Sequence, residues 1–120
     1  MTMRFERELK PYAEPVSPVD LKEGSVYFFV SFVDGELLIP SMEPVVFVGR
    51  NLEPNEVGRV YFQDVSSFRE GIRYDTTAEE HRAVFQTGSE DELGHVFGYE
   101  QALDVLLACA LRRTKLMPHT

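Results

Sequence analysis

Residues 25–33, with the sequence SVYFFVSFV, constrain the fold of this chain more than any other stretch. In an extended strand successive side chains point to opposite faces of a sheet, so Phe28 and Val30 share one face while Tyr27 and Phe29 share the other. Both faces are apolar. The alternation therefore predicts a central strand that is covered on both sides, and the rest of the chain must supply the two covers.

Further apolar segments follow, separated by turn signals, and each predicts another strand. The pair Asp34 and Gly35 is typical of a two-residue hairpin turn, so residues 36–39 (ELLI) are predicted to return beside the first strand. Because Pro40 has no backbone N–H to donate, that returning strand should end there, at an edge of the sheet. The remaining predicted strands are residues 45–49, 59–65 and 83–88, with a sixth at 95–99.

The C-terminal part carries the clearest helical pattern, which predicts a helix over residues 99–113. Apolar residues recur there at spacings of three and four, and Ala102, Val105 and Cys109 widen the apolar arc. The face expected to pack on the sheet consists of Leu103, Leu106, Leu107, Ala110 and Leu111. The face expected to meet solvent consists of Gln101, Asp104, Ala108 and Arg112.

These patterns predict an α+β fold: a mostly antiparallel, bent sheet of five to six strands with one C-terminal amphipathic helix packed on it. All 120 residues are expected to form one domain, because that length buries a sufficient core. Residues 1–20 are predicted to be an extended arm with a short helical turn at its start, residues 25–98 the sheet, and the residues after the helix a tail at 114–120. Ser89 and Glu92 also match a capping box, so the segment 89–98 is open between strand and helical turn.

The charge balance argues against two classes of partner. Twenty acidic and twelve basic side chains give a formal net charge of −8, which repels nucleic-acid phosphates and anionic lipid headgroups. The longest unbroken apolar run, residues 26–30, is far too short to span a bilayer. No nucleic acid and no membrane is therefore expected. The single cysteine, Cys109, cannot form an intramolecular disulfide, and a cytoplasmic location is predicted.

Acidic side chains concentrate between residues 75 and 92, where Arg82 is the one basic residue. We interpret this region as a solvated face that keeps the protein in solution. An alternative is a surface that binds a basic protein partner, as an inhibitor or immunity-type protein would use. The candidate partner-binding residues are Asp75, Glu79, Glu80, Glu90 and Asp91.

A first candidate ligand site combines Glu92 and His95, which are three residues apart. In a helical turn the two side chains would share a face, where they could act as an acid–base pair or as metal ligands. The alternative is an exposed surface loop. The histidines are widely separated in sequence, no CxxC pair is present, and no glycine-rich phosphate loop occurs, so neither a metal nor a cofactor is expected.

A second candidate lies in the segment FREGIRYD, residues 68–75, after a helical turn for which Ser66 or Ser67 is the expected N-cap. Guanidinium groups and a phenol could form an anion pocket here, with Asp64 holding one guanidinium. The alternative is local pairing with neighbouring carboxylates. The candidate residues are Arg69, Arg73 and Tyr74.

No catalytic signature stands out, so we expect a small cytosolic binding or accessory domain that acts through contacts with an unidentified protein partner. One alternative is a small enzyme or ligand-binding protein with a cleft near residues 69–74 or 90–95. The other is the acidic inhibitor described above. A homodimer is expected through the edge strand at ELLIP, because an edge with little charge leaves unpaired backbone groups that a second copy could meet.

Overall fold

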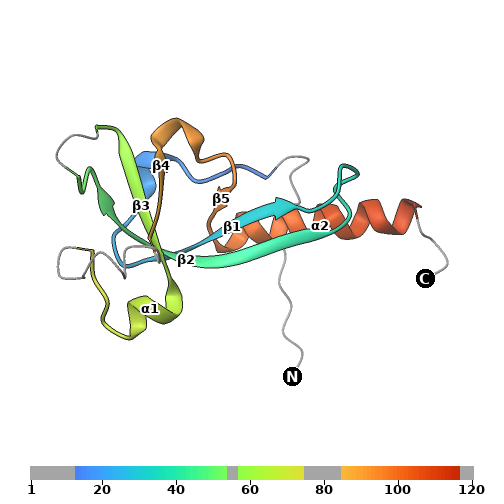
Figure 1. Ribbon diagram of the computed structural model, residues 1–120. Helices are drawn as coiled ribbons and strands as arrows, with labels where there is room; N and C mark the ends of the chain where they lie inside the picture. Colours follow the sequence, from blue (N-terminus) through green and yellow to red (C-terminus); the bar gives the residue numbers. More distant parts are fainter. Residues whose placement is uncertain (1–12, 54–56, 75–84, 117–120) are drawn as a thin grey trace, which may run out of the picture.

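A computed structural model describes residues 13–53, 57–74 and 85–116 of the chain. It confirms the α+β class: a five-stranded antiparallel sheet carries a long C-terminal helix, α2, packed on it (Figure 1). The strands are β1 (Val26–Phe32), β2 (Pro40–Arg50), β3 (Arg59–Asp64), β4 (Phe85–Ser89) and β5 (Val96–Phe97). The helices are α1 (Val65–Arg69) and α2 (Tyr99–Leu116), with 3-10 turns at Pro18–Asp20 and Glu90–Glu92.

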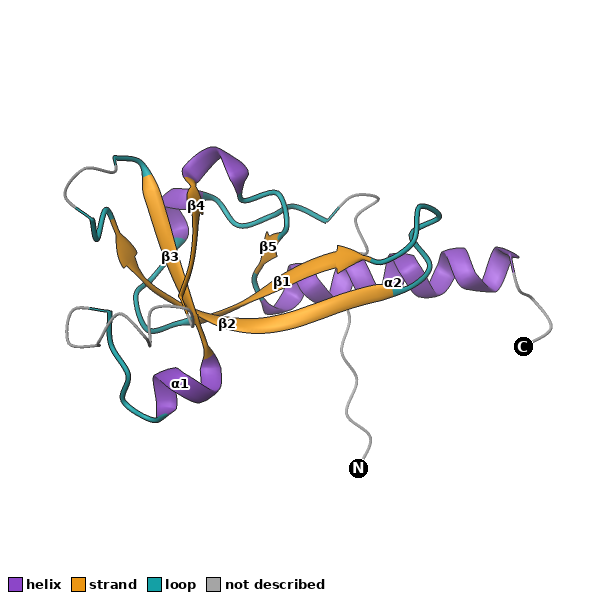
Figure 2. Ribbon diagram, in the orientation of Figure 1, coloured by secondary structure: helices purple, strands orange, loops and turns teal. Residues whose placement is uncertain are grey.

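The strand order is β4-β3-β2-β1-β5, and β2 holds the two halves of the sheet together. Its first part pairs with β1 and its last part pairs with β3, so the strand runs through both halves (Figure 2). The register with β3 shifts between Phe47 and Gly49, which is a β-bulge that bends the strand. Gly49 has a φ of 152°, and a Cβ added there would lie 3.0 Å from the side chain of Leu52.

The two faces of β1 are buried in two different cores, as the alternation of residues 25–33 predicts. Tyr27 belongs to the first core, and Phe29 packs against that core. The first core also contains Leu21, from the segment before β1, and Leu93, from the segment before β5. Val30 belongs to the second core, with Phe28 packed against it, beneath α2. The first core consists of Leu21, Tyr27, Val45, Phe47, Val60, Phe62, Leu93 and Val96, and the second of Val30, Phe97 and Ala102.

The segment Asp34 to Ile39 forms a loop, so the predicted returning strand ELLI is wrong. The Asp34 carboxylate accepts hydrogen bonds from the backbone N–H groups of Leu38 (3.1 Å) and Ile39 (2.8 Å), which closes a wider turn than a two-residue hairpin. Pro40 consequently begins β2 instead of ending a strand. The edge strand on which the homodimer was predicted is absent from this part of the described chain.

The face of α2 that packs on the sheet also differs from the prediction. Ala102 and Cys109 are buried, with Val105 half-buried against the second core, whereas Leu103 and Leu107 are about half exposed. Asp104, which was expected to meet solvent, is buried. The helix is therefore turned so that small side chains meet β1, and it runs along the β1–β2 ribbon (Figure 1).

Residues 89–98 contain both of the structures considered for them, first a helical turn and then a strand. Ser89 and Glu92 form the capping box of a 3-10 turn, and β5 follows and pairs with Phe28 and Phe29 of β1. On its other side β5 meets the N-terminal arm, because Val16 donates a backbone hydrogen bond to Val96 (2.8 Å). The predicted helical turn at the start of the chain lies outside the described residues.

Candidate functional site

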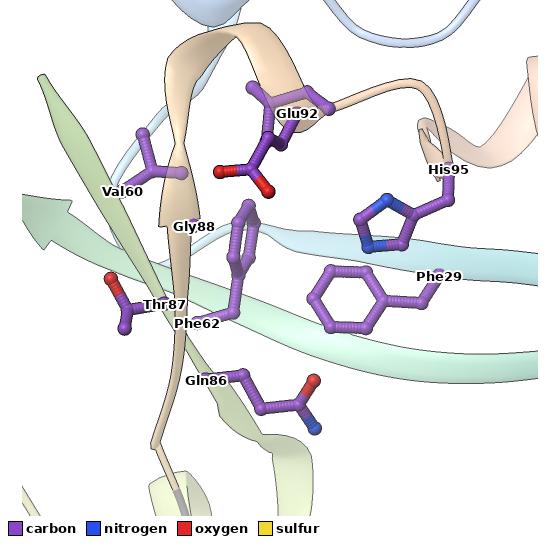
Figure 3. Close-up of a pocket in the computed structure, with 9 residues that line it drawn as sticks. Phe29, Val60, Phe62, Gln86, Thr87, Gly88, Glu92 and His95 are labelled. Atoms are coloured by element: carbon purple, nitrogen blue, oxygen red, sulfur yellow. The ribbon is translucent and has the colours of Figure 1, made fainter.

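A hollow opens between β4 and the connection from β4 to β5, and it brings Glu92 and His95 to one place (Figure 3). Its apolar floor comes from β1 and β3, which contribute Phe29 and Phe62. Gln86 and Thr87 of β4 line it from the other side. The volume is about 130 Å³, well below the roughly 300 to 1,000 Å³ of most small-molecule pockets.

The Glu92 carboxylate in this hollow is already held by its neighbour. It accepts hydrogen bonds from the hydroxyl (2.7 Å) and the backbone N–H (3.0 Å) of Ser89. The Ser89 hydroxyl, helped by that N–H, lowers the pKa of Glu92. A carboxylate stabilised in its ionised form is a weak base and is not a proton donor at neutral pH, so this arrangement favours a structural cap over acid–base work.

The imidazole of His95 lies against the ring of Phe29, with ring centroids 4.8 Å apart, and the side chain is exposed. Beside it, Gly88 of β4 pairs with the buried Val60 of β3. No atom lies within 4 Å of a Cβ built on Gly88. The hollow is thus a shallow depression with room for one small apolar group. His81, the nearest other histidine in the sequence, lies outside the described residues.

The residues of the second candidate make separate contacts. The Arg73 guanidinium donates to the carbonyls of Phe68 (2.8 Å) and Ile72 (2.9 Å) and lies over the Phe68 ring. Tyr74 hydrogen-bonds Glu53. Arg69 is exposed in the last turn of α1. Arg73 is therefore held by backbone carbonyls, and Tyr74 by the carboxylate of Glu53.

Asp64 is the N-cap of α1, in place of the predicted Ser66 or Ser67. Its carboxylate accepts hydrogen bonds from the backbone N–H (2.9 Å) and the hydroxyl (2.6 Å) of Ser67. These bonds lower the pKa of Asp64, with the Ser67 hydroxyl making the larger contribution. The predicted contact between Asp64 and a guanidinium is replaced by this cap.

The acidic surface is described only in part, because Asp75, Glu79 and Glu80 lie outside the described residues. Of the others, Glu90 forms an ion pair with Arg50 (3.7 Å), and Asp91 accepts a hydrogen bond from the Ser89 hydroxyl that lowers its pKa. The described end of this region therefore has partners within the chain.

A surface that the sequence reasoning missed lies on the outer side of α2. Four large apolar side chains recur there every four residues, a spacing that places them in one row along a helix. We call this row the outer stripe. It consists of Tyr99 (62% exposed), Leu103 (52%), Leu107 (48%) and Leu111 (54%).

A signal for the outer stripe was present in the sequence. The apolar residues of α2 occupy most of its circumference, whereas a helix that packs on one sheet needs about a 100° arc. Two apolar sides on one helix indicate two contacts. The pattern alone leaves open which side faces the sheet, and the structure assigns that side to Ala102, Val105 and Cys109.

Comparison with protein-family models, with curated proteins and with solved structures finds no match to this chain. None of the helices in the described ranges is both long and apolar enough to cross a bilayer. Nowhere in those ranges do three His, Cys, Asp or Glu side chains gather closely enough to hold a metal ion. The function must therefore be argued from the fold and from the surfaces described above.

Proposed function

We propose that this chain is a small protein-binding module and that the outer stripe of α2 is its contact surface. The observation that carries this proposal is the row of four large apolar side chains that remain about half exposed after α2 has packed on the sheet. Contiguous exposed apolar patches larger than a few hundred Å² are rare on monomeric proteins, and such patches mark interaction sites. The hollow supports a ligand-binding role less well, because it is small and its carboxylate is engaged.

The outer stripe suits a protein partner for a physical reason. Leucine side chains at a spacing of four form a ridge that fits between the side chains of another helix or an apolar groove. Isolated exposed leucines would need no explanation, but a row on one helix face does. The setting that we propose is cytoplasmic, which the single, buried cysteine supports.

Site-specific photo-crosslinking in the cells that naturally make the protein tests this function. A photoreactive residue at Leu107 should give an adduct with a defined protein, identified by mass spectrometry. Leu103→Glu should abolish that adduct, because a carboxylate in the stripe cannot be buried without a partner. The same photoreactive residue at Val57, which is 90% exposed and lies far from α2 in sequence, is the matched control.

Circular dichroism should show that Leu103→Glu leaves the fold intact, since Leu103 is half exposed. Adducts at position 107 that match those at position 57, or that persist with Leu103→Glu, would refute the proposed function.

A further inference from the structure

We infer that the chain has a second binding surface, a groove between β1 and α2 that takes a small amphipathic carboxylate, such as a medium-chain fatty acid. This inference goes beyond the proposed function. It uses neither the outer stripe nor the edge strand expected from the sequence. Three features of the groove support it: its size, its apolar walls and the guanidinium of Arg112 at one end.

The groove has the size of a small-molecule site. Its volume is about 340 Å³, within the roughly 300 to 1,000 Å³ of most such sites. Val105, Ala108 and Arg112 line it from α2. They lie three and four residues apart, so they form one row about 10 Å long on the helix. With C–C bonds of about 1.5 Å, an extended chain of roughly eight carbons covers that length.

The walls of the groove are apolar over most of that length. Val30 and Phe32 line it from β1, and Phe97 lines it from β5. Val30 and Phe97 are buried, while Val105 and Ala108 on the helix side are half-buried. No acidic side chain is among the described residues that line the groove. An alkyl chain placed here would therefore be removed from water by both the sheet and the helix.

Arg112 supplies a positive charge at one end of the groove. Its Nε and Nη2 atoms donate to the carbonyl of Leu37 (3.0 and 2.8 Å), and its guanidinium lies 5.3 Å from the centre of the Phe32 ring. These contacts hold the side chain in place and leave the N–H groups of Nη1 for another acceptor. None of its contacts within the described ranges is with a carboxylate. A carboxylate headgroup is the anion that a guanidinium complements best in shape.

The charges near this end favour an anion, although the whole chain carries a net charge of −8. Arg113 adds a second guanidinium, which donates to the carbonyl of Leu38 (2.9 Å). Asp34 lies in the same loop, but its carboxylate is directed at the backbone N–H groups of Leu38 and Ile39. Because salt screens charges beyond about 8 Å, the two guanidiniums outweigh the distant acidic residues at this position.

Two-dimensional NMR of the full chain, ¹⁵N-labelled and titrated with millimolar octanoate, measures binding. We expect saturable shifts of the backbone amides of Val30, Val105 and Ala108. The expected dissociation constant is on the order of 0.1 to 1 mM, as for a ligand of about ten non-hydrogen atoms in an open groove. 1-Octanol has the same apolar body without the charge. It should bind more weakly by about threefold or more, because hydrogen bonds to ionised groups are the stronger ones.

Three variants test the assigned parts of the groove. Arg112→Gln should weaken octanoate binding by about threefold or more and leave octanol binding unchanged, because glutamine carries no charge. Ala108→Phe should abolish the binding of both ligands, because the added ring fills the groove. Ala110→Phe makes the same change at an exposed position of α2 and is the matched control, which should bind as the parent chain does. Thermal melts of all three variants check that the fold is kept.

An octanoate titration without saturable shifts, or with shifts that Ala108→Phe leaves intact, would overturn the inference. Equal affinities of the parent chain for octanoate and octanol would overturn it as well, since the groove would then recognise no anion. Neither result bears on the outer stripe. The crosslink at position 107 therefore remains a separate test of the proposed function.

Discussion

At the scale of single residues, short polar side chains determine the turns of this molecule. Asp64 and Asp34 both accept hydrogen bonds from backbone N–H groups, Asp64 at the start of α1 and Asp34 in the loop before β2. The sequence predicts a helical turn after residue 64 and a turn at Asp34, and both are present. Ser66 or Ser67 was expected as the N-cap, but Asp64 takes that position. All three residues are of types that cap well, so residue type alone does not select among them. The choice depends on where β3 ends.

Substitution of Asp64 separates the capping contribution from the charge contribution. Asp64→Ala should lower the free energy of unfolding by about 1 kcal/mol, because the N–H of Ser67 loses its acceptor. Asp64→Asn should retain most of the stability at pH 7, since asparagine also caps. Urea unfolding at pH 7 measures both. Equal losses for the two variants would show that the charge, and not the cap, is what matters.

The same pair of variants predicts an acid dependence. The folded-state pKa of Asp64 is lowered, so its ionised carboxylate stabilises the protein above the unfolded pKa, near 3.8. That contribution is lost as the pH falls through the lower, folded-state pKa. Asp64→Asn should therefore flatten this part of the acid limb of stability, relative to the parent chain.

At the scale of the elements, the position of α2 was predictable and its rotation was not. The period of 3.6 residues identifies a helix, but leucines on one side and Ala102, Val105 and Cys109 on the other give two apolar sides to choose from. The sheet takes the side with small residues. Small side chains let the helix lie close to β1, where Ala102 meets Val30 and Phe97. Larger side chains then remain on the outer face.

This choice predicts an unusual order of mutational effects. Leu107→Ala should change the free energy of unfolding by less than about 0.5 kcal/mol when the chain is monomeric, as is usual for exposed positions. Ala102→Leu should cost about 1 to 3 kcal/mol, because added methylene groups cannot fit in a packed core. Denaturant melts at low protein concentration measure both. A larger loss for Leu107→Ala would mean that the stripe faces the sheet.

The candidate sites were only partly predictable, because each side chain has several possible partners in the folded chain. Glu92 and His95 are brought together at the hollow, as their spacing suggested, because β5 and the 3-10 turn place them on one side. Arg73 and Tyr74 are directed to different partners by contacts with Phe68 and Glu53. Spacing along the chain indicates which side chains can meet, but tertiary contacts decide which do.

At the scale of the whole molecule, the sheet-and-helix architecture follows from the apolar pattern, while the continuity of β2 does not. Pro40 was expected to end a strand, yet it begins β2, and Pro44 lies inside that strand. They are tolerated because residues 40–44 pair with β1, and the pairs of β2 with β3 begin only at Val45. A missing N–H donor on the other side of the strand then costs no ladder bond.

A strand shared by two cores predicts a single unfolding transition. Val60 is buried in the first core, away from α2 in the second. Val60→Ala should nevertheless lower the thermal midpoint equally in the far-ultraviolet signal of α2 and in the near-ultraviolet signal of tyrosine. Because β2 belongs to both cores, the two cores should lose stability together. Circular dichroism at the two wavelengths measures this. Separate midpoints would show that the two halves unfold independently.

The hydrogen bonds between α2 and the loop before β2 lower the entropic cost of binding a partner. Arg112 donates to the carbonyl of Leu37 (2.8 Å), and Arg113 donates to the carbonyl of Leu38 (2.9 Å). At the other end, the ring of Tyr99 packs on Phe28. The helix is thus fixed at both ends before a partner arrives. Little conformational entropy remains to be lost on association, so a small contact area can still give measurable affinity.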